Sequence, residues 1–163
     1  MSDNAFSVEI TRQSGYQMKA QPGREGAPAF MADETPPLGS GDGATPTELL
    51  GGAVGGCLSA SLLFCLEKAR VTVNGINTQV EGTVERNDEG RLRVAGLRVV
   101  LDVDIEDGAA GRIERCLGMF ENFCTVTQSV RQAIPIDVEV TGAGIPESAP
   151  GCTTPPQRDV FAE

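Results

Sequence analysis

The chain has 163 residues, and its composition excludes several classes of function. This length predicts one domain, and a hydrophobic share of 40% is enough to build a core. The net charge of −10 argues against nucleic acids and anionic membrane surfaces as partners. Histidine is absent, which excludes Ser-His-Asp catalysis, Cys-His catalysis and histidine-based metal sites. Any chemistry must therefore come from Cys, Asp, Glu, Arg, Lys or the backbone.

The five cysteines favour thiol chemistry over a structural role. They are odd in number and widely spread, and no two of them form a Cys-x-x-Cys motif. This pattern fits a reducing cytoplasm better than a disulfide scaffold or a zinc site. The first residues also lack the basic and apolar regions of a secretory signal. We expect a cytoplasmic protein without a bound metal or cofactor.

The first part of the chain predicts three strands followed by a loop. Apolar residues alternate over residues 5–12, 16–20 and 28–33, and the turn after the second strand carries Arg24. Residues 34–44 are rich in proline and glycine, and residues 39–44 within them loosely match a glycine-rich dinucleotide signature. Prolines rather than a parallel strand precede this match, and Asp42 within it would repel a phosphate. We therefore predict a flexible loop.

A long apolar helix is predicted over Thr45–Lys68. Thr45 can cap it, Pro46 suits its first position, and Glu48 places a negative charge in the first turn. No residue from Leu49 to Leu66 is charged, so the helix is apolar all round and should be buried. A membrane span is the other interpretation of such a run. We reject a membrane span because the segment contains four glycines, lacks flanking Trp or Tyr, and is needed to cover the predicted strands.

The glycines of this helix need a physical reason. Gly51, Gly52, Gly55 and Gly56 together cost about 3–4 kcal/mol relative to alanine. Each pair spaced by four residues shares one face, which suits the close approach of another backbone. Cys57 follows directly. From the helix alone, a small buried hydrophobic residue is the simpler interpretation of this cysteine.

The second part of the chain predicts a hairpin, two helices and a last strand. The expected ranges are 71–85 and 92–105 for the hairpin, 111–122 and 124–134 for the helices, and 136–140 for the strand. Cys124 would stand at a helix start, where the dipole favours a thiolate. The order β-β-β-α-β-β-α-α-β predicts an α+β fold with helices on one face of a sheet. We expect one domain over residues 1–141 and a Pro/Gly-rich tail over residues 142–163.

Two segments together resemble the OsmC/Ohr family of thiol-dependent peroxidases. One is Thr-Pro-Thr-Glu-Leu-Leu followed by Gly-Gly-Cys57, and the other is Phe-Cys124-Thr-Val-Thr-Gln-Ser-Val-Arg-Gln-Ala-Ile-Pro-Ile. With the order of elements, the resemblance covers nearly everything up to residue 141. It implies an intertwined homodimer, in which strands of both chains wrap around long central helices and the active sites lie at the subunit interface. The helix glycines would then allow the central helices to pack closely.

The resemblance also implies roles for particular residues. Cys57 would attack a hydroperoxide and become a sulfenic acid, Cys124 would condense with it to a disulfide, and an external thiol or dithiol would reduce the pair. The family's peroxidases lower the pKa of the first cysteine with an arginine that a glutamate holds. Arg24 and Glu48 are the candidates for these two roles.

The chain departs from the family's organic-hydroperoxide branch at two positions. Thr47 stands where that branch has its glutamate, and Thr125 stands where a proline often follows the second cysteine. These departures point to the general OsmC-like branch. They leave a second interpretation open, in which the protein has weak or no peroxidase activity and binds a small apolar ligand at the dimer interface.

Overall fold

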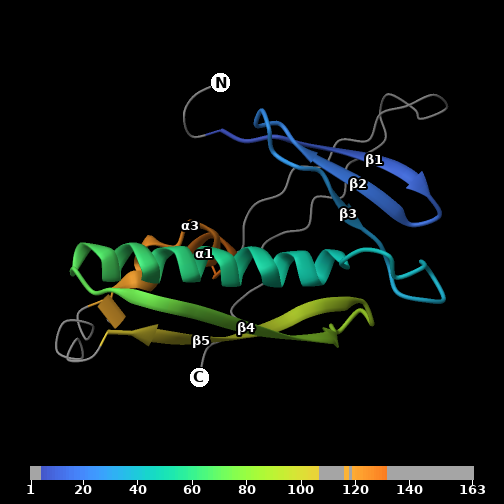
Figure 1. Cartoon of the computed structure of the whole chain (residues 1–163). Coiled ribbons are helices and arrows are strands. Elements are labelled where there is room, and N and C mark those ends of the chain that lie inside the picture. Colours follow the sequence, from blue (N-terminus) through green and yellow to red (C-terminus); the bar gives the residue numbers. More distant parts are fainter. Residues whose placement is uncertain (1–4, 107–115, 118, 132–163) are drawn as a thin grey trace. The chain divides into compact units, whose positions relative to one another are not determined.

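The computed structural model describes residues 5–106, 116–117 and 119–131. Strands and helices follow one another in runs along the chain (Figure 1), which confirms the α+β class. In chain order, the described elements are β1 (Val8–Ser14), β2 (Gln17–Pro22), β3 (Phe30–Ala32), α1 (Pro46–Lys68), β4 (Val73–Arg86), β5 (Leu92–Ile105), the 3-10 helix η1 (Phe120–Phe123) and α3 (Thr125–Arg131).

The first three strands form an antiparallel sheet in the order β1-β2-β3 (Figure 1). Ala20 pairs with Ile10 on one side and with Phe30 on the other. The predicted strands are confirmed in number and order, and their ends shift by a few residues. The apolar side chains of β1 are exposed in the single chain, with Val8 at 44% and Ile10 at 65%. The alternation in β1 therefore marks an uncovered apolar face.

The loop after β3 is organised by Asp33, whose side chain is only 2% exposed. Its carboxylate accepts the backbone N–H groups of Glu34, Ser40 and Asp42 at 2.8, 3.1 and 3.2 Å. The Ser40 hydroxyl donates to the same carboxylate at 2.7 Å. This hydroxyl contributes most to lowering the pKa of Asp33, and burial opposes it. The segment is a loop, as predicted, and these hydrogen bonds join its residues; its flexibility stays a prediction.

Helix α1 begins with a reciprocal capping arrangement between Thr45 and Glu48. The Glu48 carboxylate accepts the Thr45 N–H at 2.7 Å and the Thr45 hydroxyl at 2.9 Å. The Glu48 N–H donates in turn to the Thr45 hydroxyl oxygen at 3.3 Å. The bond from the Thr45 backbone is the largest cause of the lowered pKa of Glu48. This is the capping box of helix starts, and it confirms Thr45 as the cap.

Only one side of α1 is buried in the single chain. Val54, Leu58, Leu62 and Leu66 recur every four residues and are buried. The opposite row is exposed and consists of Gly52, Gly56, Ala60 and Phe64. The expectation that α1 is buried all round is therefore wrong for this row. Among the described helices, α1 is the one long and apolar enough to span a membrane, a test that the core helix of a globular protein also passes.

The helix glycines divide into two pairs with different surroundings. A Cβ added at Gly55 would lie 2.6 Å from Val80 Cγ2, and one at Gly51 would lie 3.5 Å from Val80 Cγ1. A Cβ added at Gly52 or Gly56 would meet nothing within 4 Å. Close approach is thus confirmed for the first pair, where the neighbour is β4 of the same chain. The second pair faces open space.

The chain groups into two compact units. The first comprises residues 1–56 and 77–102, with the three-stranded sheet, the first half of α1 and most of the hairpin. The second comprises residues 57–76 and 103–163, and its described part holds the second half of α1, η1 and α3. The single domain over residues 1–141 stays a prediction.

Several predicted elements fall on residues that the structure does not describe. Half of the helix expected over 111–122 lies there, and at its end the structure has the 3-10 helix η1. The strand expected over 136–140 and the tail over 142–163 lie outside the described residues. The helix predicted from residue 124 is confirmed by α3 up to Arg131.

Candidate active site

Two cysteines far apart in sequence meet in the second unit. Cys57 lies on α1 and is half-buried, whereas Cys124 directly precedes α3 and is fully buried. Both are free thiols. The Cys57 thiol hydrogen-bonds to the Cys124 sulfur. The two residues that the sequence singled out as a redox pair are therefore in contact.

The sulfur of Cys124 caps α3. The Gln128 N–H donates to the Cys124 carbonyl at 3.0 Å, which is the first bond of the helix. The Thr127 N–H donates to the Cys124 sulfur at 3.4 Å. A side chain that accepts this N–H occupies the N-cap position, where Ser, Thr, Asp and Asn are usual. The prediction that a helix starts at Cys124 is confirmed.

Hydrogen bonds make Cys124 the more acidic thiol of the pair. Burial is the largest single influence and by itself would raise the pKa of Cys124. The bond from Cys57, the hydroxyl and N–H of Thr127, and the hydroxyl of Ser61 together outweigh burial and lower the pKa. Thr127 Oγ1 lies 3.0 Å from the sulfur. When the thiol is protonated its S–H can donate to this oxygen, and when it ionises the hydroxyl can turn and donate to the sulfur.

The opposite holds for Cys57. Burial raises the pKa of Cys57, and its hydrogen bond to Cys124 raises that pKa further, while the backbone N–H groups of Val126 and Thr125 lower it by less. Acidity and access are thus divided, because the pKa is raised at the half-buried thiol and lowered at the fully buried one. The described residues of one chain do not supply the lowered pKa expected for a nucleophilic Cys57.

The other two candidate residues lie in the first unit. Arg24 is exposed in the turn after β2, where its carbonyl accepts the Ala27 N–H at 3.2 Å. Glu48 is part of the capping box at the start of α1. Their roles as cation and supporting carboxylate stay predictions. Among the described residues, no group of three or more His, Cys, Asp or Glu side chains could hold a metal ion.

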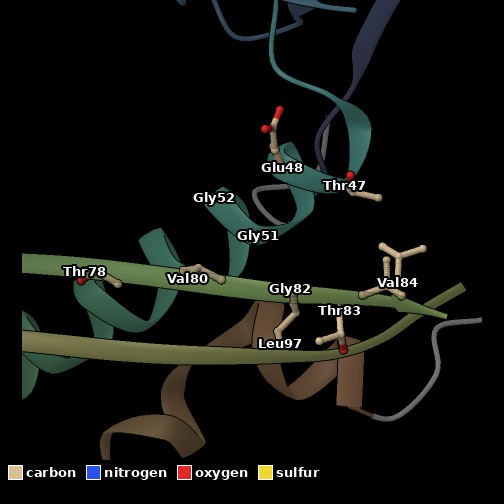
Figure 2. Close-up of a pocket in the computed structure, with 11 residues that line it drawn as sticks. Thr47, Glu48, Gly51, Gly52, Thr78, Val80, Gly82, Thr83, Val84 and Leu97 are labelled. Atoms are coloured by element: carbon tan, nitrogen blue, oxygen red, sulfur yellow. The ribbon is translucent and has the colours of Figure 1, made fainter. Parts of the chain in front are cut away.

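A pocket of about 390 Å³ lies in the first unit between the start of α1 and the hairpin (Figure 2). Gly51 and Gly52 are among its lining residues and add no side chain to it, and Figure 2 labels both near the start of α1. Its lining mixes apolar side chains with hydroxyls and one carboxylate, namely Thr47, Glu48, Gly51, Gly52, Thr78, Val80, Gly82, Thr83, Val84, Val94 and Leu97. The glycines indicated close packing, but this pocket was not predicted.

Two further site residues were missed from the sequence. Ser61 lies one turn after Cys57 on α1, and Thr127 is the third residue of α3. Both are buried, and both hydroxyls hydrogen-bond to the Cys124 sulfur. A search for polar residues one turn from each cysteine would have found them.

Comparison with solved structures identifies the fold. An OsmC-like protein from Mycoplasma pneumoniae matches with a TM-score of 0.67 and 15% identity, over 85% of this chain and 97% of that chain. An OsmC-like protein of unknown function from Vibrio cholerae matches with a TM-score of 0.64 and 16% identity, over 77% and 93% of the two chains. An organic hydroperoxide resistance protein OsmC from Legionella pneumophila matches with a TM-score of 0.60 and 12% identity, over 82% and 94%. These likenesses show the OsmC-like fold.

The sequence itself carries the family assignment. No curated protein matches the chain. The family model described as OsmC-like protein matches residues 39–139, which is more than half of the chain and includes both Cys57 and Cys124. The protein therefore belongs to the OsmC-like family.

Proposed function

We propose that the protein reduces hydroperoxides, organic ones among them, through Cys57 and Cys124. The Cys57 thiolate attacks the outer oxygen of ROOH, forming Cys57–SOH and releasing RO⁻, which takes a proton to give ROH. The Cys124 thiolate then attacks the Cys57 sulfur, forming the disulfide and releasing hydroxide, which is protonated to water. An external dithiol reduces the disulfide and is itself oxidised.

The observation that carries this proposal is the hydrogen bond between the two thiols. A sulfenic acid on Cys57 would form in contact with a second thiol, which protects it from further oxidation. Cys124 is fully buried and stands beside Cys57, so the sulfenic acid is the electrophile that it can reach. Two structural neighbours, organic hydroperoxide resistance proteins from Elizabethkingia anophelis and Legionella pneumophila, support the same proposal.

We propose further that the working unit is a cytoplasmic homodimer. The exposed row Gly52, Gly56, Ala60 and Phe64 on α1 offers a face with small side chains over which a second helix can approach. The uncovered apolar side chains of β1 add to the surface that a second chain would bury. In this assembly Arg24 and Glu48 would act as the cation and carboxylate that lower the pKa of Cys57.

The test uses reduced protein and an organic hydroperoxide. Free thiols are counted with time, and turnover is followed with an external dithiol. The parent should lose two thiols per chain and turn over. Cys57→Ser should consume hydroperoxide only at the uncatalysed rate, and Cys124→Ser should accumulate a sulfenic acid that dimedone traps. Cys65→Ser removes another half-buried thiol of α1 and should behave as the parent. A Cys57→Ser protein as active as the parent would overturn the assignment.

The pocket under α1 supports a second candidate function. A cavity of about 390 Å³ with valine and leucine side chains in its lining suits a small, mainly apolar molecule. In that case the protein binds a ligand and is a weak or inactive peroxidase. Native mass spectrometry of the purified protein would show a retained small molecule, and the thiol pair would stay reduced under hydroperoxide. Rapid disulfide formation with no retained ligand would exclude this candidate.

A further inference from the structure

Four groups hydrogen-bond with the Cys124 sulfur, and they differ in what happens to them during the reaction. They are the Cys57 thiol, the Ser61 hydroxyl, and the hydroxyl and N–H of Thr127. The protonated Cys124 thiol donates to the Thr127 hydroxyl oxygen, and this hydroxyl can turn to donate once Cys124 is a thiolate. The Cys57 S–H is lost when Cys57 ionises, and it is absent from the sulfenic acid. The groups that do not depend on the state of Cys57 come from Ser61 and Thr127. These two residues therefore set the acidity of Cys124 when Cys124 has to react.

We propose that Ser61 and Thr127 are positioning residues that keep the Cys124 sulfur an acceptor of hydrogen bonds, so that Cys124 enters disulfide formation as a thiolate. The inference rests on the proposed function, because it concerns the step in which the Cys124 thiolate attacks Cys57–SOH and hydroxide leaves. Only the thiolate is a competent nucleophile in this step. Without the hydroxyls, burial would favour the protonated thiol.

The other charged groups on the surrounding elements are engaged elsewhere. Lys68 on α1 lies over the ring of Phe64, 5.3 Å from its centroid. Arg131 of α3 is 2.6 Å from the carboxylate of Glu121 on η1. Glu67 is exposed near the end of α1. The titratable neighbour that contacts Cys124 is Cys57, and the remaining described contacts are the neutral groups of Ser61 and Thr127.

The positions of Ser61 and Thr127 support this role. Ser61 lies about 40° round α1 from Cys57 and one turn along, so both side chains point to the same side of the helix. Ser61 is 8% exposed and Thr127 is 5% exposed, so water competes little for their hydroxyls. In the described part of the chain no buried side-chain nitrogen or oxygen atom lacks a partner. The cluster consists of the two thiols and these two hydroxyls.

The first test measures the ionisation of each cysteine in the full-length reduced protein. ¹³Cβ-labelled cysteines are followed by NMR against pH, and the resonances are assigned with the single Cys→Ser variants. In the parent, Cys124 should ionise before Cys57. Ser61→Ala and Thr127→Val should each raise the ionisation pH of Cys124 by about half a unit to one unit, the effect of one hydrogen bond. Thr127→Ser retains a hydroxyl and should restore the parent value.

The second test separates this role from a merely structural one. The lifetime of the sulfenic acid after one pulse of organic hydroperoxide is measured across pH. Well below the ionisation of Cys124, Ser61→Ala and Thr127→Val should form the disulfide about two- to fourfold more slowly. Well above it they should be about two- to threefold faster, because a thiolate of higher pKa is more nucleophilic. Structural damage would instead slow the step at every pH. Ser59→Ala is the matched control, because Ser59 lies about 200° round α1 from Ser61. It should change neither the ionisation pH of Cys124 nor the rate of disulfide formation.

The outcomes are distinct. The inference is overturned if Cys57 ionises before Cys124, if neither variant moves the ionisation of Cys124, or if the variants slow the step equally at all pH values. If no sulfenic acid forms in the parent, the proposed function fails, and with it the step that the inference describes. The NMR titration would still decide whether Ser61 and Thr127 set the ionisation of Cys124.

Discussion

The Cys57 thiol on α1 hydrogen-bonds to the sulfur of Cys124, which caps α3. This contact gives the two thiols opposite pKa shifts: burial and the bond to Cys124 raise the pKa of Cys57, and hydrogen bonds lower that of Cys124 despite its burial. In one chain, the less buried thiol is therefore the one whose pKa is raised. A complete peroxidase would need a cation near Cys57, and this requirement agrees with the dimer that we propose.

Replacing Gly56 tests that dimer. Gly56→Leu adds a large side chain where a Cβ meets nothing within 4 Å in the single chain. The isolated fold should tolerate it, since leucine is a better helix former than glycine by about 0.8–1 kcal/mol. Close packing of a second helix on this row should not tolerate it. Sedimentation velocity should show a monomer for Gly56→Leu and a dimer for both the parent and Gly56→Ala. A Gly56→Leu protein that associates as tightly as the parent would place the contact elsewhere.

Gly55 should behave differently from Gly52, although both lie on α1. A Cβ at Gly55 would stand 2.6 Å from Val80 Cγ2. Gly55→Ala should therefore lower the free energy of unfolding by about 1–2 kcal/mol, because overpacking outweighs the gain in helix propensity. Gly52→Ala has open space and should raise that free energy by about 0.5–1 kcal/mol. Urea unfolding of the two variants checks the contrast, and equal midpoints would contradict it.

The capping box can be tested at Thr45. Thr45→Ala removes the hydroxyl that accepts the Glu48 N–H and donates to its carboxylate. The free energy of unfolding should fall by about 0.5–2 kcal/mol, the usual loss at an N-cap. Thr45→Ser keeps the hydroxyl and should retain most of the stability. Both variants are compared with the parent by urea unfolding. A loss as large in Thr45→Ser as in Thr45→Ala would show that the methyl group matters rather than the cap.

Asp33 should make the stability of the chain depend on acid pH. Its pKa is lowered in the fold, chiefly by the Ser40 hydroxyl. Its contribution to stability is therefore complete above the ordinary aspartate pKa of about 3.9 and is lost as the pH falls through the lower folded pKa. Asp33→Asn should reduce the urea midpoint at pH 7 and flatten the acid dependence.

Asp102 provides the control for Asp33, because it is exposed on β5. Asp102→Asn should leave both the urea midpoint at pH 7 and the acid dependence close to those of the parent. If the urea midpoint of Asp33→Asn falls with acid pH as steeply as that of the parent, other carboxylates account for the acid sensitivity.

Several features of the fold follow from local sequence. The alternation of apolar residues predicted the strands of the first sheet. Thr45, Pro46 and Glu48 predicted the start of α1, because capping and helix propensity act over a few neighbouring residues. The hydrogen bonds inside the loop after β3 were not predicted. Asp33 accepts N–H groups from Ser40 and Asp42 there. Such hydrogen bonds depend on how the backbone turns, which composition does not determine.

The sequence by itself determined the α+β class, the long apolar helix, the absence of histidine chemistry and, through resemblance, Cys57 and Cys124 as the candidate pair. Those properties reside in periodicity, residue type and motif. Only the tertiary structure decided that the two thiols touch, that Ser61 and Thr127 surround Cys124, and that Gly51 and Gly55 face β4 while Gly52 and Gly56 stay open. Contact and burial arise when distant segments pack together, and it is burial and hydrogen bonding that give two chemically identical thiols opposite pKa shifts.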